Sequence, residues 1–284
     1  MRGYSFNMKS TQLEKIRVLA MDLDDTLLHS DLSISSRTRN VIRRTEEIGL
    51  TLVLTSGRIP EAMERYVRFL GLHKRPGYLI SNNGSLITES HTENIVHEAL
   101  VDKQTILEIC DIADAEGFPL QMYADNITYI SKKNEYSDID EQLTGLRQVV
   151  VENFRDLAGF GCHKLIIPGE PNHLAAVETI IRSSLGENIS VFTSRKYFLQ
   201  ISPGKTNKGT ALSKIADVMG IGADACIAVG DSMNDEPMIH WAGIGVVMAN
   251  GDERLKSIAD FVTSKTNDED GIVEVIEKYF PVKA

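Results

Sequence analysis

The side chains that could carry chemistry in this sequence are carboxylates at the ends of apolar runs. Asp22 and Asp24 follow the run at 18–21, and Asp231 follows a second run at 226–230. If both runs are parallel strands of one sheet, these carboxylates meet at its carboxyl edge, where such sheets bind ligands. Like charges side by side are costly unless a cation or a proton compensates them. Because an oxygen-only ligand set suits Mg²⁺, we expect a magnesium site at this edge.

A second set of residues has the chemistry of a phosphate site. Ser56 and Gly57, in the sequence TSGR, offer a hydroxyl and a backbone amide near a helix start. Lys208, in TNKG, offers a positive charge at the start of another expected helix. With a metal ion, these groups suit phosphoryl transfer. One carboxylate would attack phosphorus and become an aspartyl-phosphate, and a second would protonate the leaving alkoxide and then activate water. Mg²⁺, Lys208 and backbone amides would neutralise charge on the phosphoryl oxygens.

Strand and helix signals alternate in the first third and the last third of the chain. Apolar runs at 17–23 and 50–58 are typical of buried parallel strands, and a third strand is expected at 78–87. Amphipathic segments between them predict helices that end at Gly49 and Gly71. The later elements that continue this pattern are a helix at 207–219, a strand at 226–231, a helix from about 234, strands at 244–248 and 261–263, and a final helix ending at 280.

The middle of the chain has a different pattern. Adjacent strand signals include a hairpin that turns at Asp125-Asn126, and helices are expected at 102–116, 133–148 and 172–185. Runs of strands with helices between them indicate an α+β domain with a largely antiparallel sheet. The fold class we predict is therefore α/β: a Rossmann-like parallel-sheet core formed by 1–85 and 200–284, interrupted by an inserted α+β cap domain at 86–199.

Composition limits the partners. The net charge of −10 over 284 residues argues against nucleic acid or an anionic membrane as a partner, but not against a small phosphorylated metabolite bound with a cation.

The three cysteines are odd in number and far apart, which fits reduced thiols in a cytoplasmic protein. No apolar run approaches the ~18 residues of a membrane helix. Residues 1–15 lack the apolar core of a signal peptide and are expected to fray. The sequence leaves both a monomer and a homodimer open.

Four motifs resemble those of a known family. DLDDTLL, TSGR, NKG and GDSMND, in this order, are similar to the motifs of the haloacid dehalogenase (HAD) superfamily, and more narrowly to the Cof-type sugar-phosphate phosphatases. Three further segments of the chain are similar to that branch: Asn83-Gly84, HWAGIGVVMAN and NDEDGIVEVIEKYF. The resemblance covers the chain from Arg17 onward. It implies a HAD-like core with a cap inserted between the second and third motifs, where the segment 86–199 lies.

The resemblance also implies roles at the carboxylates. Asp22 would be the nucleophile and a Mg²⁺ ligand. Asp24 would be the general acid and base, and would ligate Mg²⁺ through its backbone carbonyl. Asp231 would be a further metal ligand. One residue departs from the family pattern, because Asp25 stands where the family usually has glycine. Aspartate adopts left-handed backbone conformations better than most residues, so we expect the turn to survive.

The phosphate-binding roles follow in the same way. Ser56 and Gly57 would hold the phosphate, and Lys208 would bridge the phosphate and the nucleophile. Asn234 and Asp235 would contact phosphate or hold metal-bound water. Arg58 and Asn83 are expected to support the site, Arg58 either by contacting substrate or by pairing with a carboxylate at a helix start. The acidic residues 268–270 are expected to form a solvated loop before the last helix.

The reading that we favour is a Mg²⁺-dependent phosphatase that hydrolyses small phosphomonoesters through an aspartyl-phosphate on Asp22. Two alternatives remain. A phosphomutase on the same scaffold shares every core motif and returns the phosphoryl group to the sugar. A phosphoacceptor signalling domain also places strand-end aspartates, a Ser or Thr and a Lys around Mg²⁺, but it would be about half this length and would not need the acid and base at Asp24.

Overall fold

The computed structural model describes residues 15–280, which form two compact units. Unit 1 comprises the chain up to residue 97 and from residue 207 onward, and unit 2 comprises residues 98–206. The expected boundary at 85/86 therefore lies within unit 1, and the expected boundary at 199/200 lies within unit 2. The first boundary moves because two further strands, at 86–98, join the sheet of unit 1 instead of starting the inserted unit. The expected N-terminal extension lies almost wholly outside the described residues.

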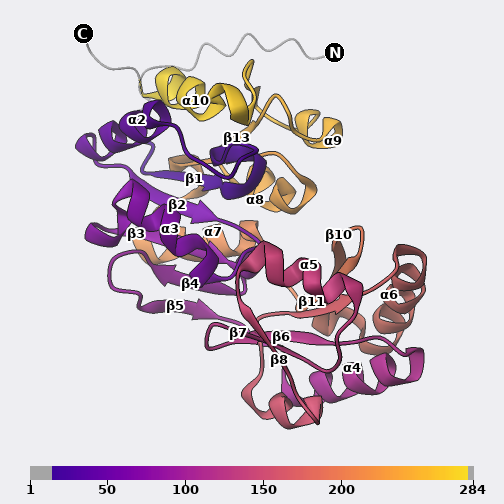
Figure 1. Cartoon of the computed structure of the whole chain (residues 1–284). Coiled ribbons are helices and arrows are strands. Elements are labelled where there is room, and N and C mark those ends of the chain that lie inside the picture. Colours follow the sequence, from indigo (N-terminus) through magenta and orange to yellow (C-terminus); the bar gives the residue numbers. More distant parts are fainter. Residues whose placement is uncertain (1–14, 281–284) are drawn as a thin grey trace. The chain divides into compact units, whose positions relative to one another are not determined.

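The central element of unit 1 is an eight-stranded sheet, counted over the described residues, with the order β14-β13-β12-β1-β2-β3-β4-β5 (Figure 1). Neighbouring strands from β14 to β3 are parallel, and β4 then pairs with β3 in the antiparallel direction. The strands are β1 (Val18–Asp22), β2 (Thr51–Thr55), β3 (Gly77–Ser81), β4 (Leu86–Glu89), β5 (Ile95–Glu98), β12 (Cys226–Gly230), β13 (Ile244–Val247) and β14 (Phe261–Val262).

Helices cover both faces of this sheet, because its central strands are apolar on both sides. Leu19 and Met21 of β1 join a core with helices α2, α3 and α10, whereas Val18 and Ala20 join a second core with α7 and α8. Successive strand residues point to opposite faces, so one apolar run supplies both cores. The helices of unit 1 are α2 (Ser36–Glu47), α3 (Pro60–Leu70), α7 (Lys208–Met219), α8 (Glu236–Trp241), α9 (Glu253–Lys256) and α10 (Gly271–Tyr279). This three-layer arrangement confirms the expected Rossmann-like core.

Unit 2 contains a six-stranded sheet, counted over the described residues, with the order β10-β11-β9-β6-β7-β8. Every described pairing is antiparallel except that of β7 with β8. Helices α4 and α6 share one apolar core with one face of this sheet. The elements are α4 (Lys103–Glu116), β6 (Gln121–Ala124), β7 (Ile127–Ile130), α5 (Glu135–Thr144), β8 (Arg147–Val150), β9 (Leu165–Pro168), α6 (Pro171–Leu185), β10 (Ile189–Arg195) and β11 (Phe198–Pro203).

Within unit 2 the expected hairpin is confirmed, but one of the expected helices is shorter and a strand follows it. The hairpin turns at Asp125 and Asn126, which both have positive φ, between β6 and β7. The helix expected at 133–148 ends instead at Thr144, because Gly145 takes a left-handed conformation (φ 72°) and caps it. The strand β8 begins two residues later, at Arg147, and the sequence analysis missed it.

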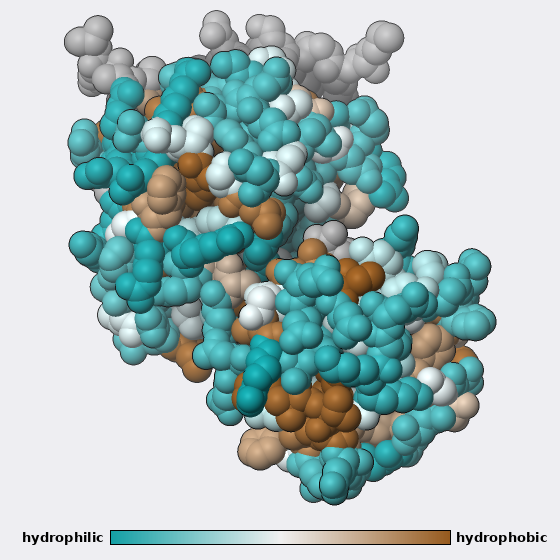
Figure 2. Space-filling model, in the orientation of Figure 1, coloured by the Kyte–Doolittle hydropathy of each residue, from teal (hydrophilic) through white to brown (hydrophobic). Residues whose placement is uncertain are grey.

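In the view of Figure 2, apolar patches, among them a contiguous one on unit 2, lie among hydrophilic side chains. Over residues 15–280, no helix combines the length and the apolar character needed to cross a membrane. Cys110, Cys162 and Cys226 are buried free thiols, as their spacing predicted. Burial raises the pKa of the Cys162 thiol to about 12, so this side chain is an unreactive part of the core.

Candidate active site at the carboxyl end of the parallel sheet

The carboxyl ends of β1, β2 and β12 bring the predicted residues to one edge of the sheet. Asp22 is the last residue of β1 and pairs with Thr55 of β2, directly before Ser56. On the other side, Met21 pairs with Val229 of β12, which places the end of that strand beside Asp22. The polar residues after these strands are therefore neighbours because the strands are parallel and in register.

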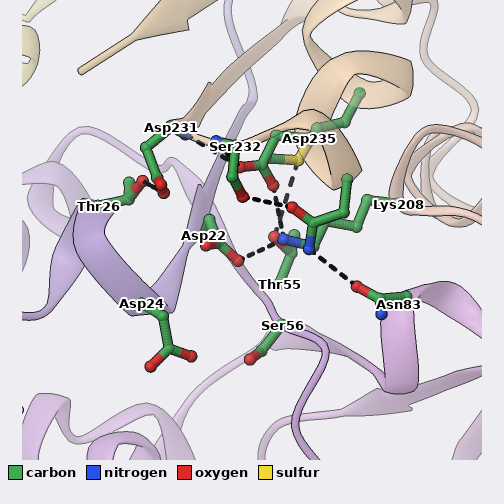
Figure 3. Close-up of polar contacts among 12 residues, drawn as sticks. Asp22, Asp24, Thr26, Thr55, Ser56, Asn83, Lys208, Asp231, Ser232 and Asp235 are labelled. Carbon is green, nitrogen blue, oxygen red and sulfur yellow. Dashed lines mark hydrogen bonds and ion pairs between the residues drawn. The ribbon is translucent and has the colours of Figure 1, made fainter. Parts of the chain in front are cut away.

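A short loop follows β1. Residues 23–27 form one turn, which is closed by a hydrogen bond from the N–H of Leu28 to the carbonyl of Leu23 at 2.8 Å. Asp24 is extended (φ −69°, ψ 132°), and Asp25 is left-handed (φ 55°, ψ 10°). Asp25 thus takes the left-handed conformation that the sequence analysis expected it to tolerate. Because the backbone changes direction here, the side chains of Asp22 and Asp24 point to different places (Figure 3).

Lys208 joins two carboxylates inside the protein. It is the first residue of α7, where Asn207 caps the helix by accepting a hydrogen bond from the N–H of Thr210 at 2.8 Å. The Lys208 side chain is 0% exposed, and its Nζ lies 2.5 Å from Asp22 Oδ1 and 2.5 Å from Asp235 Oδ1 (Figure 3). Burial opposes the charge, but the two carboxylates outweigh it and raise the pKa of Lys208 above its usual value. Lys208 is therefore a buried ammonium ion at this edge.

Asp231 and Asp235 come from the turn after β12. Asp235 Oδ2 accepts hydrogen bonds from the backbone N–H groups of Asp231 (2.9 Å) and Ser232 (3.1 Å), which fixes the turn. Asp231 Oδ1 accepts a hydrogen bond from Thr26 Oγ1 at 2.7 Å. This bond links the loop after β1 to the turn after β12. Sequence reasoning gave Thr26 no role, and its place in the DLDDTLL motif was the one available signal.

The carboxylates of Asp22, Asp231 and Asp235 form a possible cation site. Each offers an oxygen, and these oxygens lie within 4.8 Å of one another. Burial, followed by repulsion from Asp235, raises the pKa of Asp22 well above its usual value despite the Lys208 contact. The same two causes, in the same order, raise the pKa of Asp231 to about 7. Three carboxylates facing one ammonium ion leave excess negative charge, so a hard divalent cation fits this oxygen donor set.

The three carboxylates of this cluster differ in part from the metal ligands that the sequence predicted. Asp22 and Asp231 were expected to bind metal, and their oxygens are in the cluster. Asp235 was expected to contact phosphate or metal-bound water, yet its oxygen lies in the same cluster. Asp24 was expected to contribute only its backbone carbonyl, and its side chain lies apart from the cluster in Figure 3.

Asp24 instead pairs with Arg58. Arg58 Nε donates to Asp24 Oδ2 at 2.8 Å, and Arg58 Nη2 donates to Asp24 Oδ1 at 2.5 Å. The hydrogen bond to Asp24 raises the pKa of Arg58. Of the two roles considered for Arg58, the structure shows the carboxylate pair. Its partner could not be read from the sequence, because nothing in TSGR specifies which acidic residue lies opposite.

The expected phosphate-binding residues form a connected group after β2 and β3. Ser56 is buried, and its Oγ accepts a hydrogen bond from the N–H of Arg58 at 3.1 Å. Asn234 Nδ2 donates to Asn83 Oδ1 at 3.0 Å. A Cβ atom on Gly57 would lie 3.0 Å from the Asn83 amide nitrogen, so glycine allows this close approach. Asn83 thereby links Gly57 to the turn after β12, and Figure 3 shows it beside the Lys208 group.

Together these groups can support nucleophilic chemistry on an anion. Asp22 is a buried carboxylate held by an ammonium ion, next to oxygens that can bind a cation. Asp24 is a second carboxyl group, 40% exposed, on the following turn. Ser56 and Lys208 offer a hydroxyl and a positive charge near the same strand ends. This combination suits transfer of a phosphoryl group to and from a carboxylate.

Comparison with known proteins identifies the family. A model of the haloacid dehalogenase-like hydrolases matches residues 19–276, so the chain belongs to this family of hydrolases. A solved structure of a haloacid dehalogenase-like hydrolase from Bacteroides thetaiotaomicron is 30% identical, with a TM-score of 0.87 over 93% of this chain and 100% of that one.

Curated relatives carry phosphatase names. The chain is 27% identical to a Bacillus subtilis protein named putative phosphatase YxeH, over 92% of this chain and 97% of that protein. It is 26% identical to the 5-amino-6-(5-phospho-D-ribitylamino)uracil phosphatase YitU of Bacillus subtilis, over 93% of this chain and 97% of that protein. The match thus extends across both units of the chain.

Proposed function

We propose that this hydrolase is a Mg²⁺-dependent phosphatase that acts on small phosphomonoesters, with Asp22 as the nucleophile. One observation carries the proposal: Asp22 is buried at a strand end, paired with Lys208 and clustered with two further carboxylates. A structural ion pair would need only one carboxylate for one ammonium ion. The surplus negative charge is instead suited to a site that a cation and a phosphate complete. The phosphatase names of the relatives support the same reaction class.

The chemistry proceeds in two steps. In the first, an Asp22 carboxylate oxygen forms a bond to phosphorus, the bond to the leaving oxygen breaks, and the Asp24 carboxyl gives that oxygen its proton. In the second, Asp24 takes a proton from water as the water oxygen attacks phosphorus, which releases phosphate and regenerates Asp22. Because Lys208 holds Asp22 Oδ1, Oδ2 is the oxygen assigned to attack.

The remaining residues bind and orient. Lys208 and the hydroxyl of Ser56 contact phosphoryl oxygens, and Asn83 and Asn234 keep the adjoining turns together. Asp22, Asp231 and Asp235 would hold Mg²⁺, with the Asp24 carbonyl as the expected further ligand. When bound, the ion supplies positive charge that offsets the developing charge on the phosphoryl group. Arg58 orients Asp24 through its two hydrogen bonds.

Unit 2 is proposed to select among substrates. One face of its sheet packs on α4 and α6, but the other face carries buried polar side chains such as Gln121, Thr128 and Gln200. On that face Tyr123 donates a hydrogen bond to Asp140 of α5 at 2.8 Å. A polar sheet face suits recognition of hydroxyl or amine groups. If it selects substrates, Tyr123→Phe changes the ratio of kcat/KM between two phosphate esters by several-fold, and an unchanged ratio refutes this role.

The experiment that tests the reaction is phosphate release from a panel of phosphomonoesters, with Mg²⁺ and with EDTA. The panel includes hexose phosphates, pyridoxal phosphate and the ribitylaminouracil phosphate in the names of the relatives. We expect Mg²⁺-dependent release that Asp22→Asn abolishes. Asp217→Asn is the matched control, because Asp217 is an exposed carboxylate on α7. No release from wild-type protein across the panel contradicts the phosphatase.

The alternatives give different results in the same assay. A phosphomutase converts a sugar phosphate into its isomer without stoichiometric release of phosphate. A phosphoacceptor domain becomes labelled at Asp22 by a small phosphodonor and shows no turnover of esters. Product analysis by NMR and trapping of the labelled protein separate these outcomes from hydrolysis.

A further inference from the structure

Two C-terminal sequences with no assigned role, VVMANG and TNDEDG, contact the loop after β1. Asn250 Nδ2 donates to the backbone carbonyl of Asp25 at 2.7 Å. Asn267 Nδ2 donates to the backbone carbonyl of Leu28 at 2.9 Å. The N–H of Asn267 donates in turn to Asn250 Oδ1 at 3.0 Å. Asn250 and Asn267 thus form a bracket, in which each asparagine is bonded to the other and to the loop.

The loop has a reason to need external support. Asp25 holds a positive φ of 55° although it carries a side chain, and such a conformation is disfavoured for residues other than glycine. The Leu28-to-Leu23 bond already described closes the loop on itself. Asp24, which lies next to Asp25, depends on this backbone for its position. The bracket bonds to the loop at two points: the carbonyl of Asp25, which has the positive φ, and the carbonyl of Leu28, where the turn closes.

A second layer of contacts continues the bracket outward. Asp268 accepts hydrogen bonds from the N–H and Oγ of Ser30, both at 2.7 Å. Asp270 is only partly exposed and serves as a shared acceptor; its donors are Ser35, Thr38 and His29. The expectation of a solvated acidic loop at 268–270 was therefore wrong for Asp270, because these donors surround it. Asn267, Asp268 and Asp270 thus all bond to the chain between the end of β1 and the first turn of α2.

We propose that Asn250 and Asn267 are positioning residues that hold the loop so that Asp24 reaches the leaving oxygen. This inference rests on the proposed phosphatase function, in which Asp24 is the general acid. Neither asparagine contacts the carboxylate cluster in any described interaction, so each acts through the backbone of the loop. Removal of the bracket should therefore weaken acid catalysis more than it weakens phosphate binding.

The test compares Asn250→Ala with wild-type protein on two substrates. Asn250 is exposed, so its loss leaves the core packing intact. An alkyl phosphate needs a proton on its leaving oxygen, whereas p-nitrophenyl phosphate releases a stable anion that needs none. We compare kcat/KM, which reports phosphoryl transfer to Asp22 and excludes the later hydrolysis that both esters share. It should fall roughly tenfold or more for the alkyl ester, in the range of general acid catalysis, and much less for the nitrophenyl ester.

The matched control is Asn94→Ala, which removes an exposed asparagine of unit 1 from the turn between β4 and β5. It should leave the ratio of the two kcat/KM values unchanged. The double variant Asn250→Ala/Asn267→Ala should lose little more than the more damaging single variant, because the two residues act as one unit. A general loss of folded protein would instead lower both rates equally.

A second readout does not depend on activity. Hydrogen exchange of the backbone amides at 23–32 should be about tenfold faster in Asn250→Ala than in wild type, and unchanged in Asn94→Ala, because one loop-holding bond is lost. If this exchange rate does not change, or if kcat/KM falls equally for both esters, the positioning role is overturned. If wild-type protein hydrolyses neither ester, the proposed function fails, and the exchange experiment still decides whether the bracket holds the loop.

Discussion

Replacement of Lys208 by methionine tests the charge balance on which the site depends. Lys208→Met keeps the side-chain length but removes the ammonium group that contacts Asp22 and Asp235 inside the protein. Two buried carboxylates then face each other without the group that paired them. We expect the variant to fold less stably in the absence of metal, because uncompensated buried charge is costly.

The size of the effect follows from the contacts. Each of the two hydrogen bonds is charge-assisted, a class that contributes roughly 1.5–3 kcal/mol per bond. Removal of one partner of a buried ion pair costs roughly 3–5 kcal/mol. We therefore expect the free energy of unfolding at pH 8, in EDTA, to fall by about 3–5 kcal/mol. The loss should shrink towards pH 5, since a proton can neutralise Asp22, whose pKa is already raised by burial.

The assay is urea unfolding followed by circular dichroism at pH 8 and pH 5. Lys214→Met is the matched control, because Lys214 lies on the same helix and is exposed. It should change the free energy of unfolding by no more than about 0.5 kcal/mol. A loss below about 1 kcal/mol for Lys208→Met at pH 8, or an equal loss at both pH values, would show that the buried charges are not balanced as described.

Three further predictions concern the same edge of the sheet. Gly230→Ala would place a Cβ atom 2.5 Å from the Cβ of Asp235, so unfolding experiments should show a loss of about 1–3 kcal/mol, whereas Gly159→Ala, with open space around it, should change little. Arg58→Lys cannot form the two-bond contact with Asp24, so steady-state kinetics should show kcat reduced about tenfold with native circular dichroism. The pKa of Asp231 rises from 3.8 to about 7 on folding, so the folded state holds its proton more tightly. In EDTA, urea unfolding should therefore show stability that falls as pH rises from about 4 to about 7 and then levels, and Mg²⁺ should restore most stability above pH 7.

The parallel core was readable from the sequence because its signals are local. The continuous apolar run of β1 supplies both cores of unit 1, and this double burial is what such a run indicates. The chemistry at the strand ends followed from topology alone, since parallel strands deliver Asp22 and Asp231 to the same edge. The left-handed conformation of Asp25 was also foreseen, from the conformational range of aspartate.

The errors arose where the structure depends on contacts between distant segments. Strands β4 and β5 extend the sheet of unit 1, which no local pattern at 86–98 reveals. The strand β8 was taken for the end of a helix because Gly145 was not recognised as a helix cap. The acidic residues near 270 were judged by their charge, whereas Asp270 is surrounded by hydroxyl donors more than 200 positions earlier in the chain.

The same limit applied to the partners of the site residues. The pairing of Arg58 with Asp24 joins two strand ends, and the bond from Asn250 to Asp25 spans 225 residues. Residue type left Arg58 two roles, contact with substrate or pairing with an acid, and the strand order places Asp24 opposite it. Sequence motifs therefore predicted which polar residues follow the strands, and the order of the strands determined which of them touch.

The order of strands in unit 1 also dictates the order in which the protein can assemble during synthesis. β1 lies between β2 and β12, and more than 200 residues separate β1 from β12. Unit 2 is one continuous segment that ends at residue 206, so all its strands have been synthesised before β12 is made. Until then one edge of β1 lacks its partner, and an unpaired apolar edge invites aggregation. Asp22 also waits for Lys208 and Asp235, so the nascent enzyme remains inactive until the last third of the chain has joined the sheet.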